Sequence, residues 1–336
     1  MKVVITGASG NIGTALLRDE SWDTVIGLSR RRPENTTLPY VECDIGGSTA
    51  VAQLTEACAG ADVVVHLAWA VHPRSSDPDM RRTNLDGTTN LLRAVVAAGV
   101  PHLVCASSVA AYASADRRQF VTEDWPCDGV EDSAYSRGKS VLESQLDTFE
   151  HRHPAVKVAR IRPCGVVQAG AAAKFREWLL SPLIPVTLLG RSWLPVPLWN
   201  GMRLQLVHSE DVASALRLIV QSGATGAFNL AAEPVLDADE VAHRFGGRRV
   251  PVPLGVLTSA AWATWRLGLQ PLHPGWIRLA DRASLVDSTK ARTELGWTAR
   301  HDAASTLDEL VDAMRSLGRA SYRIRPGRPS HQSQSP

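Results

Sequence analysis

Short apolar runs, rich in β-branched residues, alternate with stretches of helical periodicity through the first half of the chain. The runs have the length of buried strands, whereas the stretches between them repeat their apolar residues at helical spacing. The expected strands cover residues 3–6, 24–29, 40–43, 63–67, 103–107 and 156–161, and the clearest expected helices cover residues 83–98 and 135–151. Strands that alternate with helices in this way form a parallel sheet with helices on both faces. We therefore predict an α/β fold built on a doubly wound parallel sheet, with ligands at the carboxyl ends of its strands.

Three glycines, spaced three residues apart, follow the first apolar run directly. Glycine permits a sharp turn and a close approach of the backbone to a pyrophosphate, and the helix that starts next directs free N–H groups at the anion. The spacing G-x-x-G-x-x-G differs from the plain dinucleotide fingerprint G-x-G-x-x-G. Its position after a strand nevertheless predicts the phosphate-binding turn of a Rossmann fold. The residues expected to contact the cofactor here are Gly7, Ser9, Gly10, Asn11, Ile12 and Gly13.

The periodic pattern loosens after about residue 165, where prolines cluster and seven of the ten tryptophans are found. We expect a dinucleotide-binding Rossmann domain over residues 1–165, rejoined by a strand and a helix at about 204–230. A smaller, discontinuous substrate-binding region is expected over residues 166–203 and 231–316. Residues 317–336 have little apolar surface to bury, so a disordered tail is expected there.

Composition narrows the choice of partners. The formal net charge is only +2 over 336 residues, which disfavours nucleic acid as a partner. No stretch approaches the ~18 apolar residues of a membrane span, and the chain starts with a core strand instead of a signal peptide. A soluble, cytoplasmic protein without a membrane partner is therefore expected. The five cysteines are scattered and lack metal-ligand spacing, which predicts reduced thiols and no metal site.

The end of the second expected strand bears on the choice of dinucleotide. An NAD-specific Rossmann fold usually places Asp or Glu there, to bind the ribose hydroxyls and repel a 2′-phosphate. This chain has Ser29, Arg30 and Arg31 instead, and arginine suits a 2′-phosphate because it offers bidentate, charge-assisted hydrogen bonds. NADP is therefore the expected cofactor, with NAD possible, and a solvated basic turn is the alternative. Asp44 and Ile45, after the third strand, are expected to cap the adenine, unless Asp44 is an ordinary turn residue.

Tyr135 and Lys139 place a phenol and an ammonium one turn apart on the same face of an expected helix. A free phenol has a pKa near ~10, and an adjacent cation lowers this pKa by stabilising the phenolate. Such a tyrosine exchanges a proton with a carbinol or carbonyl oxygen while hydride moves to or from a nicotinamide. The alternative is an exposed helix pair without a catalytic role.

Two hydroxyls, Ser107 and Ser108, end a buried strand at the edge of the sheet where ligands bind. One of them is placed to hydrogen-bond the substrate oxygen. Serine pairs at strand ends are also common turn formers.

The order and spacing of these motifs resemble an extended short-chain dehydrogenase/reductase, of the NAD(P)-dependent epimerase/dehydratase family. The resemblance covers about residues 1–300 and continues beyond the motifs above in Asn84–Thr88, Arg162–Pro163, Leu206–Ala213, Ser288–Ala291 and Leu295–Trp297. It implies that Tyr135 is the acid/base, that Lys139 holds the nicotinamide ribose, and that Ser108 polarises the reacting oxygen. Ser108 is preferred to Ser107 because it lies four residues before Tyr112, as the catalytic Ser or Thr does in the family.

The resemblance also implies further cofactor contacts and an assembly. Asn84 matches an asparagine that supports a water near the lysine, although a hydrogen bond that braces the neighbouring strand is an equal alternative. Trp69 lines the pocket or packs in the core. Relatives commonly form homodimers through the helices that correspond to 83–98 and 135–151, so a homodimer is expected. The expected contacts beyond those already named are Leu67, Ala68, Trp69, Asn84, Ala106, Tyr135, Lys139, Pro163 and Val166.

One departure from the family narrows the reaction. Sugar 4,6-dehydratases carry an Asp-Glu pair after the catalytic Ser or Thr, whereas this chain has Val109 and Ala110, which disfavours dehydration by that route. Arginines that suit a diphosphate, Arg176, Arg191 and Arg203, lie among Trp, Leu and Pro, so a less polar substrate is equally expected. We predict an NAD(P)-dependent oxidoreductase that interconverts a carbonyl and an alcohol on a small organic substrate. The alternatives are a sugar-nucleotide 4-epimerase with tightly bound NAD and a non-catalytic, dinucleotide-sensing regulator.

Overall fold

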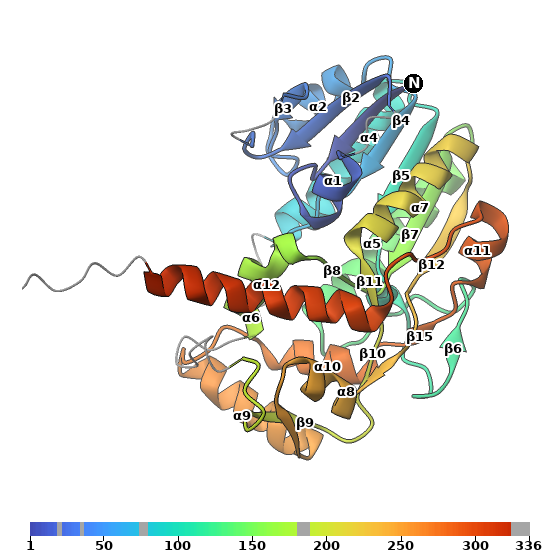
Figure 1. Cartoon of the computed structure of the whole chain (residues 1–336). Helices are drawn as coiled ribbons and strands as arrows, with labels where there is room; N and C mark the ends of the chain where they lie inside the picture. The colour runs from blue at the N-terminus through green and yellow to red at the C-terminus, as the bar shows by residue number, and fades with distance from the viewer. Residues whose placement is uncertain (19–21, 34–36, 74–79, 180–188, 324–336) are drawn as a thin grey trace, which may run out of the picture.

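A computed structural model describes residues 1–18, 22–33, 37–73, 80–179 and 189–323 (Figure 1). Its centre is a parallel sheet of seven strands in the order β12-β7-β5-β4-β1-β2-β3. From β1 the chain builds the sheet in one direction through β2 and β3, and then in the other through β4, β5, β7 and β12. The doubly wound α/β fold predicted from the sequence is therefore confirmed. The strands are β1 (Lys2–Thr6), β2 (Thr24–Ser29), β3 (Tyr40–Glu42), β4 (Val63–His66), β5 (His102–Ala106), β7 (Lys157–Pro163) and β12 (Gly226–Leu230).

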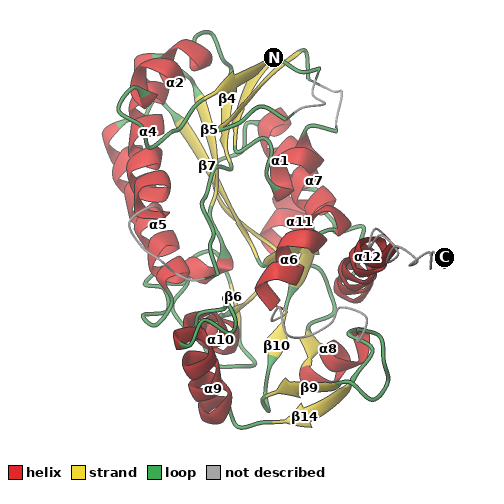
Figure 2. Cartoon of the chain, turned by 90° about the vertical axis from the view of Figure 1, so that its left-hand side faces the viewer, coloured by secondary structure: helices red, strands yellow, loops and turns green. Residues whose placement is uncertain are grey.

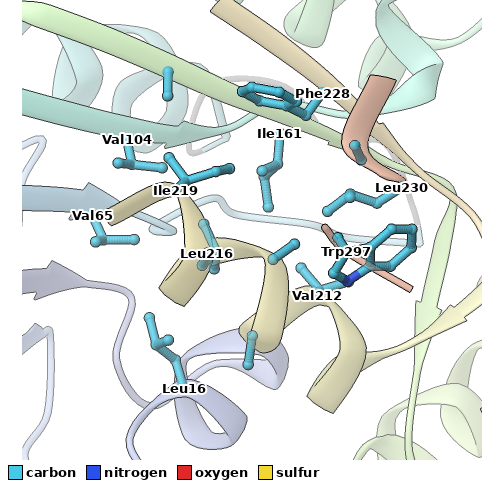
Figure 3. Close-up of a cluster of buried hydrophobic side chains, with 14 of the residues drawn as sticks. Leu16, Val65, Val104, Ile161, Val212, Leu216, Ile219, Phe228, Leu230 and Trp297 are labelled. Atoms are coloured by element: carbon cyan, nitrogen blue, oxygen red, sulfur yellow. The ribbon is translucent and has the colours of Figure 1, made fainter. Parts of the chain in front are cut away.

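Helices cover both faces of this sheet, because successive strand residues point to opposite sides. On one face, Val3 and Ile5 of β1 share a core with Leu16 of α1 (Asn11–Leu16) and Leu216 of α7 (Ser209–Ser222). Figure 3 shows this face, with Leu216 and Ile219 packed toward Val65, Val104 and Ile161 of the strands.

On the other face, Val4 packs with Leu54, Leu91 and Leu142. These three leucines come from α2 (Ala50–Cys58), α4 (Gly87–Ala97) and α5 (Ala134–Arg152), which lie together on one side of the sheet in Figure 2. The helix expected over 83–98 begins as a π-helical turn, η1 (Arg82–Asp86), before it continues as α4. The cores on the two faces hold the strands in place, and with them the carboxyl edge of the sheet, where the candidate site lies.

The second half of the chain forms a smaller body below that edge (Figures 1 and 2). Its core joins residues such as Leu189, Trp199, Leu236, Leu307 and Met314. Besides α7 and α11 (Thr289–Leu295), which pack on the large sheet, this half of the chain contains α6 (Ala172–Leu179), α8 (Ala238–Arg244), α9 (Leu254–Arg266), α10 (Pro274–Arg282) and α12 (Ala303–Arg323). Four two-stranded sheets pair β8 (Gly165–Val167) with β11 (Leu206–His208), β9 (Pro195–Leu198) with β14 (Arg248–Pro251), β10 (Arg203–Leu204) with β13 (Leu236–Asp237), and β6 (Phe120–Val121) with β15 (Leu285–Val286).

Two expectations about this half differ in detail. The strand expected near residue 204 is β11, which pairs with β8 and not with the large sheet, whereas α7 covers the sheet and β12 joins it. The expected disordered tail starts inside α12, which continues to Arg323, and residues 324–336 lie outside the described residues. None of the helices in the described ranges combines the length and the apolar character of a membrane span.

Candidate active site

The glycine turn lies at the point where the winding of the sheet reverses, between β1 and β4. Gly7 has φ +69°, and a Cβ there would lie 2.6 Å from the backbone nitrogen of Ala68. A Cβ on Gly13 would lie 2.5 Å from the carbonyl oxygen of Gly7, and one on Gly10 would lie 3.0 Å from that same oxygen. The turn is therefore closed by backbone atoms, which leaves no room for side chains. A cradle of this kind fits the pyrophosphate of a dinucleotide.

The helix that follows the turn leaves its first N–H groups available. Gly10 is the N-cap of α1 and provides no side-chain cap. The Asn11 side chain points elsewhere, because its Nδ2 donates to the Val166 carbonyl at 2.9 Å. Gln168 Nε2 donates to the Asn11 carbonyl at 2.8 Å, and this residue was not among those expected from the sequence. Ser9 is exposed and Ile12 is half-buried against the core.

The basic turn after β2 is open to solvent. Arg30 and Arg31 are exposed, and within the described part of the chain neither forms an ion pair. Ser29 Oγ donates to the Arg31 carbonyl at 2.7 Å and accepts from the Tyr40 hydroxyl at 2.6 Å. Two unpaired guanidiniums and a fixed hydroxyl therefore lie at the end of the strand where a 2′-phosphate is expected.

The two residues expected at the adenine are already engaged by the protein. Asp44 accepts a hydrogen bond from Arg82 at 2.8 Å, in an ion pair that is about half-exposed. Ile45 is 5% exposed and packs in the core against the position of Gly87. Contacts of either residue with an adenine remain predictions.

The segment after β4 is held by hydrogen bonds to its backbone. Leu67 N donates to the Thr6 carbonyl at 3.1 Å and Ala68 N to the Thr6 hydroxyl at 3.3 Å. Asn84 binds both polar groups of the Ala70 backbone, at 2.6 Å and 2.9 Å. Its amide thus makes the bracing bond that was the alternative to supporting a water. The backbone of Leu67 and Ala68 lies directly beside Gly7 of the glycine turn.

Ser108 and Tyr135 meet at the carboxyl end of β5, although they are far apart in the sequence. Ser133 caps α5 by accepting the Ser136 N–H at 3.3 Å, which places Tyr135 in the first turn of that helix. The Ser108 hydroxyl lies close enough to the phenol of Tyr135 to lower its pKa. Ser108 Oγ also accepts the Ala110 N–H at 3.1 Å and lies 3.5 Å from the Pro163 carbonyl oxygen. Of the two strand-end serines, Ser108 is therefore the one beside the tyrosine.

Lys139 lies one turn further along α5 and is 3% exposed. Its ammonium donates to the Ala106 carbonyl at 2.8 Å and lies 3.7 Å from the centre of the Trp69 ring. A Cβ at position 138 would lie 3.3 Å from that ring, so Gly138 leaves the space that the indole occupies. Trp69 is thus a wall of the site that covers the lysine.

The pKa values differ from the expectation that the lysine acidifies the phenol. Burial raises the pKa of Tyr135, and the nearby Ser108 hydroxyl offsets this only in part. Burial lowers the pKa of Lys139 to about 7, against the opposing charges of Cys105 and Glu143. The ammonium already contacts the Ala106 carbonyl and the Trp69 ring. Because burial lowers its pKa, only part of the lysine is protonated near neutral pH. The phenol of Tyr135 is consequently protonated at pH 7.

A second tryptophan, Trp276, covers the phenol and was not expected from the sequence. Its ring centre lies 5.2 Å from that of Tyr135 and 6.1 Å from that of Trp178. α10 holds it in place, because Arg278 pairs with Asp132 at 2.8 Å and the turn before α10 bonds to the loop after β4. The only signal in the sequence is the excess of tryptophan in the second half of the chain.

A buried ion pair joins α5, the helix that carries Tyr135 and Lys139, to strand β7. Arg162 of β7 donates twice to Glu143 of α5, both times at 2.8 Å, and Arg160 donates to the same carboxylate at 2.9 Å. Burial opposes ionisation of Glu143, but the two arginines outweigh it and lower its pKa to about 2. Arg162 also donates to the Tyr112 hydroxyl at 2.9 Å. The pair fixes α5 on the sheet.

One further cluster contains residues that commonly bind metals: His208, Glu210 and His301. His208 Nδ1 accepts the Glu210 N–H at 3.2 Å, so in the neutral ring Nε2 carries the proton, 3.2 Å from the Glu309 carboxylate. In that tautomer the ring offers no lone pair to a cation. The cluster therefore braces the start of α7 against α12.

Several known proteins are similar in sequence to this chain. An uncharacterised protein of Sinorhizobium fredii is 28% identical over 319 residues, which cover 91% of this chain and 76% of that protein. Another, from Mycobacterium tuberculosis, is 26% identical over 74% of this chain, but the chain spans only 64% of its length. A UDP-glucose 4-epimerase of Lactobacillus helveticus is 25% identical over 90% of this chain and 93% of its own length.

Among solved structures, a Thermus thermophilus UDP-glucose 4-epimerase in complex with NAD has a similar fold. It is 24% identical, with a TM-score of 0.69 over 94% of this chain and 99% of that one. The model of the NAD dependent epimerase/dehydratase family matches residues 3–231, from the first strand of the sheet to the last. The chain therefore belongs to the NAD dependent epimerase/dehydratase family and is an NAD(P)-dependent enzyme of that type.

Proposed function

We propose that this protein is an NADP-preferring oxidoreductase that reduces a carbonyl to an alcohol, or runs the reverse reaction, on a small organic substrate. The observation that carries this proposal is the position of Ser108 beside a protonated Tyr135 at the carboxyl end of β5, with the buried Lys139 one helical turn away. A hydroxyl pair at this place can hold a carbonyl oxygen and deliver a proton to it.

Each residue of the site has a separate role in the proposed hydride and proton transfer. A bound nicotinamide dinucleotide supplies or accepts the hydride. Gly7, Gly10 and Gly13 leave the space for its pyrophosphate. Ser108 orients the substrate oxygen, and Tyr135 donates its proton to that oxygen during reduction. Lys139 carries a positive charge beside the site while it is protonated, and this charge can hold the ribose of the nicotinamide.

The elevated pKa of Tyr135 supports carbonyl reduction as the favoured direction near neutral pH. A phenol whose pKa lies above its usual range is protonated at pH 7, so it is ready to act as the acid. Oxidation of an alcohol needs the phenolate, which becomes populated only at higher pH. The enzyme should therefore oxidise alcohols best in alkaline buffer.

The preference for NADP rests on Arg30 and Arg31. Both side chains are exposed and unpaired within the described residues, and no carboxylate ends β2. A 2′-phosphate is an ideal partner for guanidinium groups.

The substitution Tyr135→Phe tests the assignment. It removes the proton donor but keeps the ring that packs on Trp276, so turnover should fall by ~10²-fold to 10⁴-fold while NADPH affinity stays within about twofold. Tyr112→Phe is the matched control, since it removes a buried hydroxyl bonded to Arg162 and Asn229 and should lower thermal stability while turnover persists. Unchanged turnover in Tyr135→Phe would exclude this tyrosine as the acid/base.

A sugar-nucleotide 4-epimerase is the second candidate, favoured by the likeness to the Lactobacillus helveticus enzyme. An epimerase oxidises and re-reduces one carbon with a cofactor that stays bound. Protein purified without added nucleotide would then retain NAD, and UDP-glucose would be converted without net change at 340 nm. Purified protein free of nucleotide that consumes NADPH stoichiometrically with a carbonyl would favour the reductase.

A further inference from the structure

Tyr135 lines a cavity that has a volume of about 250 Å³. Its walls come from three separate segments: the loop after β4, the turn η1 with the two residues before it, and the first two turns of α5. Trp276 of α10 closes it. The lining residues are Trp69, Ala70, Val71, His72, Met80, Arg81, Asn84, Leu85, Ala134, Tyr135, Arg137, Gly138, Val141 and Trp276.

Most of this surface is apolar. Trp69 and Trp276 both line it, and each also packs on one member of the catalytic pair. Met80, Leu85 and Val141 add aliphatic surface. A ligand that buries an aromatic or branched aliphatic group here gains about 25 cal/mol for each Å² of apolar area removed from water.

The charges in the lining all have one sign. Arg81 and Arg137 both border the cavity, whereas no Asp or Glu does so among its described lining residues. Arg137 donates to the backbone carbonyl of Glu131, and within the described ranges neither guanidinium pairs with a carboxylate. Both side chains are exposed at the rim, where they can meet an anionic group of a ligand.

Resting on the proposed function, we infer that the substrate is a small organic acid: one carboxylate, held by Arg81 and Arg137, on a compact apolar body that carries the reacting carbonyl. The carbonyl carbon accepts hydride from the reduced nicotinamide and its oxygen accepts the proton of Tyr135, which gives the hydroxy acid and the oxidised dinucleotide. A nucleoside diphosphate sugar fits this cavity poorly, because about 250 Å³ lies below the ~300–1,000 Å³ of pockets that hold drug-sized ligands.

The test compares three ligands on the full chain: an aryl-substituted keto acid, its methyl ester and UDP-glucose. NADPH oxidation gives kcat/KM, and isothermal titration in the presence of NADP gives affinity without turnover. The acid should exceed the ester by about tenfold or more in both measurements, since a charge-assisted hydrogen bond contributes about that factor. UDP-glucose should bind at least tenfold more weakly than the acid.

Variants of the two arginines test whether they bind the carboxylate of the ligand. Arg137→Gln and Arg81→Gln should each weaken the acid about tenfold and leave the ester within twofold. Arg93→Gln, on the exposed side of α4 and outside the cavity lining, should change neither.

Several outcomes would overturn the inference. These are equal kcat/KM for acid and ester, an equal loss of both ligands in the arginine variants, tighter binding of UDP-glucose, or no binding of any of the three to a protein that binds NADPH. If the ester is reduced as well as the acid and Tyr135→Phe abolishes both reactions, the proposed function stands and only the substrate class is wrong. A protein that binds no pyridine nucleotide would refute both.

Discussion

The two sides of the crevice are built from different materials. The side proposed to bind the dinucleotide consists of backbone: a glycine turn that no side chain can enter, next to the first N–H groups of α1. The substrate side consists of side chains from the β4 loop, α5 and α10, which meet only in the folded chain. The comparison teaches that a surface made of backbone has no room for an added side-chain atom. A surface made of side chains can instead change its ligand preference when one residue is substituted.

The largest effect is expected for Gly13→Ala on the dinucleotide side. The new methyl would lie 2.5 Å and 2.6 Å from the carbonyl oxygens of Gly7 and Ala8, and backbone atoms cannot rotate away. We expect the dissociation constant of NADPH to rise more than ~100-fold, with a loss of ~1–3 kcal/mol in the free energy of unfolding. Titration calorimetry and chemical denaturation measure the two quantities.

Gly255→Ala is the matched control, since this glycine also lies in a helix but meets nothing within 4 Å. It should leave NADPH affinity unchanged and raise stability by at most ~1 kcal/mol. Equal effects of the two substitutions would show that the crowding at Gly13 is irrelevant.

The pH dependence tests the side-chain half of the comparison, with a change of about tenfold for each pH unit. Lys139 has a pKa of about 7 because burial disfavours its charged form; Glu143 and Cys105 oppose this shift, and His66 is the other titratable neighbour. The ammonium exists below this pH and is lost above it. We expect kcat/KM for carbonyl reduction to fall as the pH rises above about 7.

Substitutions at Lys139 and Trp69 test whether Lys139 causes this alkaline limb, the fall in kcat/KM above about pH 7. In Lys139→Arg the guanidinium keeps its charge at all these pH values, so the limb should disappear even if the rate is lower throughout. Trp69→Leu removes the ring over the ammonium and should move the limb to lower pH, whereas Trp69→Phe should keep it in place. An unchanged limb in Lys139→Arg would assign it to another group.

The smallest effect is expected at the exposed end of β2. Arg30→Ala should weaken NADPH about tenfold and leave NADH within twofold, because only NADPH carries the 2′-phosphate. The difference should shrink as salt is added, since both partners are solvent-exposed. Arg93→Gln serves again as the control, and equal losses for the two cofactors would mean that the basic turn is only solvated.

Much of the site followed from short motifs because each is a local structure. The glycine turn after β1 and the helical spacing of Tyr135 and Lys139 depend only on neighbouring residues. The position of the Ser107–Ser108 pair at the ligand-binding edge was also predictable from a parallel sheet, whereas the choice of Ser108 rested on the resemblance to the family. The raised pKa of Tyr135 was not, since it depends on burial by distant segments.

The alternation of strands and helices in the sequence determined the sheet, its winding and the place of the dinucleotide turn, because backbone hydrogen bonds and residue periodicity act over short distances. Only the tertiary structure decided that Trp276 covers the phenol, that Trp69 covers the lysine and that Arg82 occupies Asp44. These contacts join residues far apart along the chain, and close packing, which no local pattern encodes, selects which of them meet.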